Sequence, residues 1–324
     1  MLKLAKKILF FGDFGIDDVI ALLYARMDPT IEIIGLVTGY GNISEHNAED
    51  NALFLRALTK AEASIDIIRG AYKPYTGAFP RYPEEIHGKF GLGPLSPYSA
   101  NIDNKRIHDY SKAVDLIKRH RNKITVVNVG RLSSLSSMFV LYPEVAEMIK
   151  EIYVMGGAFF TPGNVTPVAE ANIYGDPYAA NLVFTVQKKV KIIPLNVTNF
   201  AILTKDMIQI ITTHCKDPSV GPIIKEIFDY YFEFYQETNA THSNIGAPIH
   251  DLLALWAALH PEYMNYIEAP VTVVVEKGDA YGQTIADVRI SDQKEDYPLQ
   301  HIAMKFNYQA FIQSIFNAFT NKNG

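Results

Sequence analysis

Short apolar runs recur along this chain and alternate with segments that have the apolar spacing of a helix. Ile8–Gly12 and Ile31–Thr38 are two such runs, and Asp17–Arg26 between them has helical spacing. Strands that alternate with helices predict βαβ units and a mainly parallel sheet. Further strands are predicted at Ile65–Ile68, Lys123–Val129, Ile152–Met155, Val190–Leu195, Val271–Val275 and Gln283–Ile290, the last two antiparallel. We therefore predict one large Rossmann-like α/β domain over residues 1–324, with helices flanking a central sheet.

Composition excludes several classes of protein. Hydrophobic residues make up 48% of 324 residues, which is enough for a large core, and the formal net charge is -5. Without a strongly basic stretch, no nucleic-acid partner is predicted. The lone cysteine, Cys215, excludes an intrachain disulfide and fits a reducing compartment. The first apolar run is too short for a signal peptide, and no run is long enough to span a membrane. We expect a cytoplasmic protein.

Polar or glycine-containing turns follow several of the predicted strands. These turns read GDFGIDD, TGYGN, NVGRLSS and MGGAFF. The carboxyl ends of parallel strands lie at one edge of a sheet, and ligands bind at that edge in open α/β folds. The sequence therefore predicts that the four turns converge on one binding site.

The first turn lies in the stretch FFGDFGIDD, Phe10 to Asp18. It matches neither GxGxxG nor a P-loop, so a phosphate cradle is not indicated. Asp13 ends the predicted strand, and Asp17 and Asp18 begin the predicted helix. Carboxylates grouped in this way suit Ca²⁺ or Mg²⁺. The alternative is that Asp17 and Asp18 only complement the helix dipole, which leaves Asp13 unexplained.

Two further polar clusters stand apart in the sequence. His250 and Asp251 open the apolar helix predicted over 251–259, where Asp251 taken alone is more typical of a helix cap and His250 of a core histidine. The segment GNVTPVAEANIYGDP, residues 163–177, gathers amides and carboxylates in one short loop. Such groups suit a polyhydroxylated ligand, although they can also form Asx turns.

Together these segments resemble the inosine-uridine nucleoside hydrolase family. The family pattern Asp-x-Asp-x-Gly-x-Asp-Asp corresponds to FGDFGIDD at residues 11–18. GYGNISEHNAEDNA, IHGKFGLG, VMGGAF, GNVTPVAEANIYGDP and the late His-Asp pair follow in family order. The resemblance runs from about residue 7 to beyond residue 260, and six ordered motifs are far more specific than one.

The resemblance implies a Ca²⁺-dependent hydrolase that splits the N-glycosidic bond of ribonucleosides into free base and ribose. The implied Ca²⁺ ligands are Asp13, Asp18, Asp251 and the backbone carbonyl of Ser133. Asp13 would also be the general base, with Asn42 supporting the attacking water and His250 assisting the leaving base. The implied substrate contacts are Asp17, Asn164, Glu170 and Asn172 on the ribose hydroxyls, Met155 in the sugar pocket and His87 at the base. The resemblance implies a nucleoside as the small-molecule partner. It also implies assembly of the chain into a homodimer or homotetramer, which is the habit of the family.

The chain departs from the family pattern at three positions. Phe11 replaces an aspartate that buttresses the site, Ala171 replaces an aromatic residue, and Arg131 replaces a proline. The base-facing segment Gln236–Ile245 matches poorly, so base preference does not transfer. Two alternatives stay open: a hydrolase of another ribosyl compound, and a binding protein that has lost catalysis. Aromatic residues in 226–235 fit either an oligomer interface or core packing.

Overall fold

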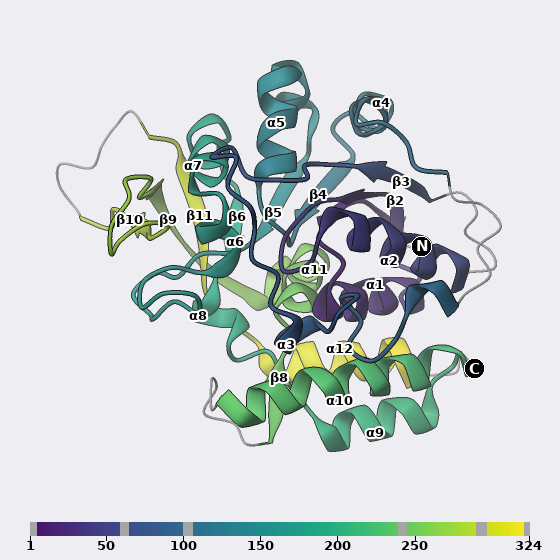
Figure 1. The fold of residues 1–324 in the computed structure, drawn as a ribbon. Helices are drawn as coiled ribbons and strands as arrows, with labels where there is room; N and C mark the ends of the chain where they lie inside the picture. The colour runs from purple at the N-terminus through teal and green to yellow at the C-terminus, as the bar shows by residue number, and fades with distance from the viewer. Residues whose placement is uncertain (1–4, 59–64, 100–105, 239–244, 290–296, 321–324) are drawn as a thin grey trace.

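A nine-stranded sheet runs through the centre of the molecule in the computed structural model, which describes residues 5–58, 65–99, 106–238, 245–289 and 297–320 (Figure 1). In spatial order its strands are β10 (Thr284–Ala286), β9 (Met264–Val273), β11 (Leu299–Phe306), β6 (Lys191–Ile193), β5 (Glu151–Met155), β4 (Ile124–Asn128), β1 (Lys6–Gly12), β2 (Ile31–Thr38) and β3 (Asp66–Arg69).

Strand directions confirm the predicted class of sheet. All neighbouring pairs from β11 to β3 are parallel, whereas β9 pairs antiparallel with both β11 and β10. The late antiparallel strands are shorter or shifted relative to the sequence prediction, since β10 covers only 284–286 of the predicted 283–290. Strand β11 and the small pair β7 (Ile202–Thr204) and β8 (Gly246–Pro248) were not predicted.

Two hydrophobic clusters cover the two faces of the sheet. Alternate residues of β1 enter different clusters: Ile8 and Phe10 face one side, and Leu9 and Phe11 face the other. The cluster with Leu9 includes side chains of α4 (Ser111–Arg119), α5 (Ser133–Leu141) and α7 (Pro177–Val186). The opposite cluster includes side chains of α1 (Ile16–Met27), α2 (Glu45–Leu58), α9 (Lys205–His214), α10 (Val220–Thr238), α11 (His250–Leu259) and α12 (Tyr308–Thr320). The result is a three-layer α/β arrangement (Figure 1).

Several short helical segments complete the chain. They are α3 (Glu84–His87), α6 (Ala171–Gly175), α8 (Leu195–Thr198) and the 3₁₀ turns η1 (Pro97–Ser99), η2 (Pro143–Met148) and η3 (Pro261–Tyr263). The η2 segment is a short 3₁₀ helix that starts at a proline. Among the described residues, no helix has the length and apolar character needed to cross a membrane.

The order of the strands creates a crevice beside β1. From β1 the chain moves outward to β2 and β3, and then returns to β4 on the other side of β1. The connections that leave the carboxyl ends of β1 and β4 therefore diverge, which opens the sheet edge at that point. Ligands of open α/β folds bind at this kind of switch point.

Candidate active site

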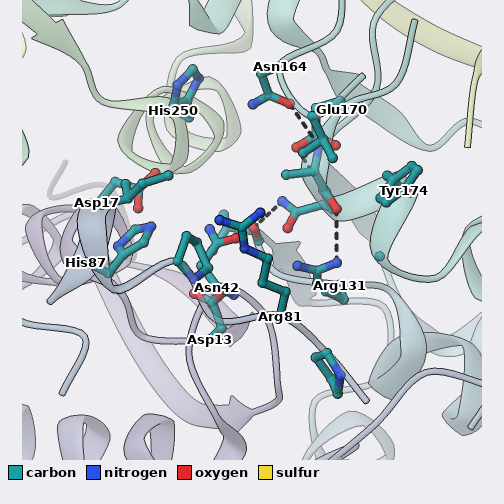
Figure 2. Close-up of a pocket in the computed structure, with 18 of the residues that line it drawn as sticks. Asp13, Asp17, Asn42, Arg81, His87, Arg131, Asn164, Glu170, Tyr174 and His250 are labelled. Atoms are coloured by element: carbon teal, nitrogen blue, oxygen red, sulfur yellow. Dashed lines mark hydrogen bonds between the residues drawn. The ribbon is translucent and has the colours of Figure 1, made fainter. Parts of the chain in front are cut away.

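A cavity of about 790 Å³ opens at the carboxyl ends of β1, β4 and β5. Its walls come from the β1–α1 turn, α3, the 163–175 loop, α10 and the start of α11, which are far apart in the sequence. Asp17, His87 and His250 lie along one side, and Asn164 and Glu170 lie along the other (Figure 2). The predicted convergence of polar turns on one edge of the sheet is thus present in the structure.

Three carboxylates meet at the floor of this cavity. Asp17 and Asp18 come from the first turn of α1, and Asp251 comes from the first turn of α11. One oxygen atom of each lies within 4.8 Å of the others. The three residues are 7%, 1% and 3% exposed, respectively, so water screens their charges poorly.

Mutual repulsion and burial make this cluster unfavourable when it is ionised. Burial, followed by the charges of Asp13 and Asp17, raises the pKa of Asp18 well above its usual value. Burial, followed by the charges of Asp17, Asp18 and Asp13, also raises the pKa of Asp251 well above its usual value. A divalent cation relieves both effects, because it supplies the missing charge and accepts carboxylate oxygens as ligands.

Local features of the site fit a hard cation. Oδ1 of Asp18 is buried and has no hydrogen-bond partner among the described residues. Glycines make room for the carboxylates: a Cβ at Gly12 would lie 2.2 Å from that same oxygen, and one at Gly41 would lie 1.8 Å from Oδ2 of Asp13. The sequence-based alternative of a helix cap is wrong for Asp251, because the N-cap of α11 is Ile249 and has no side-chain cap.

Asp13 lies at the edge of the cluster. It is buried at the end of β1, and its carboxylate accepts hydrogen bonds from the backbone N–H groups of Gly15 and Asn42. The three carboxylates that lie within 4.8 Å of one another are those of Asp17, Asp18 and Asp251. The family resemblance instead implies Asp13 as the third ligand beside Asp18 and Asp251. The four aspartates interact electrostatically, since Asp13 contributes to the raised pKa of both Asp17 and Asp18.

Ser133 lies behind the cavity wall. Its hydroxyl donates to Asp176 over 2.6 Å and contacts the Tyr40 hydroxyl at 2.8 Å, and the residue does not line the cavity. The side chain therefore anchors the start of α5. The role expected of the Ser133 backbone carbonyl stays a prediction.

The opposite wall carries the residues predicted to contact ribose. Glu170 is buried and caps α6 by accepting hydrogen bonds from the N–H groups of Asn172 and Ile173. The side-chain amide of Asn172 donates to the carbonyls of Val129 and Met155. Asn164 accepts from the N–H of Ala171. The cavity is lined by Glu170, Asn172, Met155, Asn164 and Asn42, and their contacts with a substrate stay a prediction.

The two histidines have defined environments. Nδ1 of His87 accepts a hydrogen bond from the N–H of Ile16 at 3.1 Å, which ties the ring to the start of α1. His250 contacts the Thr198 hydroxyl through Nδ1 at 2.8 Å and the Tyr235 hydroxyl through Nε2 at 3.1 Å. Burial, followed by the charge of His87, lowers the pKa of His250 to about 4.

Sequence reasoning missed the aromatic wall of the cavity. Tyr231 and Tyr235 of α10 line it, and their hydroxyls are 3.2 Å apart. Their spacing of four residues places them on one face of a helix, which was the available signal. Within the base-facing segment Gln236–Ile245, residues 239–244 lie outside the described residues.

The three departures from the family pattern have different surroundings. Phe11 is buried in the apolar cluster on the α5 side of the sheet, so it packs instead of buttressing the carboxylates. Arg131 and Ala171 both line the cavity and contact one another, since the guanidinium donates to the Ala171 carbonyl at 3.2 Å.

Comparisons with known proteins agree with this geometry. The profile of the family described as inosine-uridine preferring nucleoside hydrolase matches residues 8–313. The chain belongs to that family. It is therefore an N-glycosyl hydrolase that acts on nucleosides. Its sequence is 31% identical to a probable uridine nucleosidase 1 of Oryza sativa subsp. japonica, covering 90% of this chain and 88% of the relative.

Other nucleoside hydrolases match nearly the whole chain. An inosine-uridine preferring nucleoside hydrolase of Crithidia fasciculata is 30% identical and covers 97% of both chains. Among solved structures, a plant nucleoside hydrolase superposes with a TM-score of 0.88 at 26% identity, covering 97% of this chain and 98% of its own. A purine-preferring ribonucleoside hydrolase from Gardnerella vaginalis superposes with a TM-score of 0.86 at 27% identity and the same coverage.

Proposed function

We propose that this nucleoside hydrolase is Ca²⁺-dependent and transfers the ribosyl group of a ribonucleoside to water, releasing the free base and ribose. The observation that carries the proposal is the buried cluster of Asp17, Asp18 and Asp251 on the floor of the cavity. Polar groups that suit sugar hydroxyls line the wall opposite. A purely structural cluster of this kind would leave several repelling charges buried without compensation.

The proposed cation site combines the aspartates of α1 and α11 with Asp13. Their ligand atoms are carboxylate oxygens, which suit Ca²⁺ better than a metal that prefers nitrogen or sulfur. When bound, Ca²⁺ would supply positive charge that keeps the aspartates ionised and would hold oxygen atoms of the reactants in place. Metal analysis of the purified protein tests this ligand set directly.

Asp13 is the proposed general base. Its carboxylate is held in one orientation by the N–H groups of Gly15 and Asn42, and it lines the cavity. A carboxylate fixed in this way can accept the proton of the attacking water. Glycosidic cleavage develops positive charge on the sugar ring, as in glycoside hydrolysis. The acidic floor and Glu170 favour that charge.

His250 is the proposed partner of the leaving base. A pKa of about 4 leaves the ring neutral near pH 7 in the ligand-free protein. Negative charge that develops on the departing base would raise the pKa of His250, so that the ring takes up a proton from solvent, gives it to the base and returns to its neutral form. The hydroxyls of Tyr235 and Tyr231 continue the hydrogen-bonded chain from Nε2. The three groups would deliver a proton to the base side of the cavity.

Base preference is a separate question. Relatives are named for uridine, for inosine and uridine, and for pyrimidines, and one structural neighbour is named as purine-preferring. We therefore propose ribonucleosides as the substrate class without choosing a base. The contact between Arg131 and Ala171 supports the alternative of another ribosyl compound, since it alters the cavity wall beside Glu170. The cytoplasmic location and the homodimeric or homotetrameric assembly stay predictions.

A nucleoside panel with and without EDTA tests the proposal. Purified protein is incubated with uridine, cytidine, inosine, adenosine and guanosine, and free ribose is measured. We expect cleavage that EDTA abolishes and added Ca²⁺ restores. Cleavage that persists in EDTA would contradict the metal proposal. Binding of nucleosides without any release of ribose would favour the non-catalytic alternative.

A further inference from the structure

Arg131 occupies an unusual place in the cavity wall. Its Nη1 donates to the carbonyl of Ala171 and its Nη2 donates to the carbonyl of Gly41, each at 3.2 Å. The guanidinium carbon lies 5.7 Å from the centre of the Tyr40 ring. Within the described part of the chain, no carboxylate lies within ion-pair distance of this guanidinium. Arg131 is therefore held by two backbone carbonyls and one aromatic face.

The two carbonyls belong to different halves of the site. Gly41 directly precedes Asn42, whose N–H donates to the proposed base Asp13. Ala171 lies between Glu170 and Asn172 on the sugar side. Gly41 and Ala171 are about 130 residues apart in the sequence. Arg131 comes from a third segment, the turn after β4. One planar guanidinium thus joins the water side of the cavity to the sugar side.

The neighbouring residues leave space for this side chain. A Cβ built at Gly175 would lie 1.3 Å from Nη1 of Arg131 and 2.2 Å from its Cδ and Cζ. The backbone at Gly175 is not left-handed, and the three atoms nearest to an added methyl group all belong to the arginine. Small residues at 171 and 175 therefore accompany the arginine at 131.

We propose that Arg131 is a positioning residue that fixes the distance between the Gly41–Asn42 turn and the Glu170–Asn172 segment. The inference rests on the proposed function, since these segments carry the groups assigned to water activation and to ribose binding. A guanidinium presents several N–H donors in a rigid fork, which suits two carbonyls at once. A lysine ammonium is a single point and cannot reproduce that fork.

Misplacement of reacting groups by about 1 Å can cost about a hundredfold in rate. We therefore expect Arg131→Met to lower kcat/KM on the best nucleoside by about a hundredfold, with kcat falling as well as KM rising. Arg131→Lys keeps the charge but should recover little activity. Arg119→Met, at an exposed position of α4, serves as the matched control and should match the parent.

Hydrogen–deuterium exchange provides a readout that does not depend on catalysis. In Arg131→Met we expect faster exchange in both residues 39–44 and residues 163–175, with unchanged exchange in β4 and β5. This readout also separates the two hypotheses. If the parent cleaves no nucleoside, the proposed function fails, whereas coupled loosening of both segments would still support the positioning role.

Gly175→Ala gives an independent test through a double-mutant cycle. The added methyl group should displace the guanidinium and lower kcat/KM by more than about tenfold when Arg131 is present, but by less than about twofold in the Arg131→Ala background, because interacting sites are non-additive. Additive effects would overturn the proposal. So would kinetics within twofold of the parent in Arg131→Met, a lower melting temperature with unchanged kcat and KM, or full recovery of activity in Arg131→Lys.

Discussion

Replacing Asp18 by asparagine should make the metal-free protein more stable while it removes the response to Ca²⁺. Oδ2 of Asp18 accepts the N–H of Gly15 at 3.1 Å, and asparagine retains an oxygen for this bond. Oδ1 is buried without a partner, and burial together with the charges of Asp13 and Asp17 disfavours ionisation. The substitution therefore removes an uncompensated buried charge and one proposed metal ligand.

The pH dependence follows from the sign of the pKa shift. The pKa of Asp18 is raised above 3.8 in the folded protein. Such a group contributes full stability below about pH 4, and that contribution is lost as pH rises through the raised pKa of the folded state. The metal-free parent should therefore lose stability as pH rises above about 4. Asp18→Asn should lose less, so the difference between the two proteins widens with pH.

The size of the Ca²⁺ response can be calculated from mass action. Free Ca²⁺ at a hundred times its Kd stabilises the folded state by about 2.7 kcal/mol. Unfolding entropy is about 2.1 cal/mol/K per residue, which for 324 residues is about 0.7 kcal/mol/K. The melting temperature of the parent should thus rise by about 4 °C. Asp18→Asn should respond by less than about 1 °C at the same Ca²⁺ concentration.

Differential scanning calorimetry at pH 5 and pH 8, in EDTA and over a Ca²⁺ titration, measures both effects. Asp206→Asn is the matched control, because Asp206 is exposed in the first turn of α9. The reasoning is refuted if Asp18→Asn melts below the parent in EDTA at pH 8. It is also refuted if the variant gains the same 4 °C as the parent from Ca²⁺.

Three other predictions concern catalysis and the first residue of strand β5, Glu151. Asp13→Ala should lower nucleoside turnover by several powers of ten, whereas Asp17→Ala should also raise KM; turnover near that of the parent in Asp13→Ala would contradict its role as base. His250→Ala should slow natural nucleosides by about a hundred- to ten-thousandfold but spare p-nitrophenyl riboside, whose leaving group needs no proton. Equal losses on both substrates would indicate sugar positioning or packing. Burial opposes ionisation of Glu151, but hydrogen bonds from Lys191 and Lys6 outweigh it and lower the pKa to about 2. That stabilisation is complete above about pH 4.5 and is lost as pH falls toward 2. Glu151→Gln should therefore be less stable than the parent in urea at pH 7, and the difference should shrink as pH falls from 4.5 toward 2.

Periodicity and turn chemistry were sufficient to predict the class of fold. The apolar run of β1, its glycine and the helical spacing of α1 are local features, and they indicate a βα unit without any knowledge of the partner strands. Parallel strands then place their carboxyl ends together. For this reason the sequence also predicted that Asp13, Asp17 and Asp18 would lie near polar turns that follow other strands.

Local patterns could not determine non-local pairing. Strand β11 lies between β9 and β6, although its partners are about 35 and 110 residues away in the sequence. Its residues pair parallel on one side and antiparallel on the other. No periodicity within Leu299–Phe306 specifies those neighbours, because register and strand order depend on how all the layers pack together.

The identity of the site residues divides in the same way. Sequence motifs identified Asp18, Asp251, Glu170 and Asn172 before any geometry was known. Tertiary structure decided that Asp17 completes the group of three carboxylates, because the rotation of α1 against α11 sets which oxygens approach within 4.8 Å. It also placed Tyr235 against His250. Both depend on helix packing, which one-dimensional spacing does not encode.

Arg131 illustrates the limit most directly. The sequence identifies it as a departure from the family pattern, forty residues before a second departure at Ala171. Only the fold brings the turn after β4 against α6 and the Gly41 turn, and only then does the guanidinium reach both carbonyls. A side chain's donors are set by its chemistry, but the acceptors within reach are set by segments that meet after the whole chain has packed.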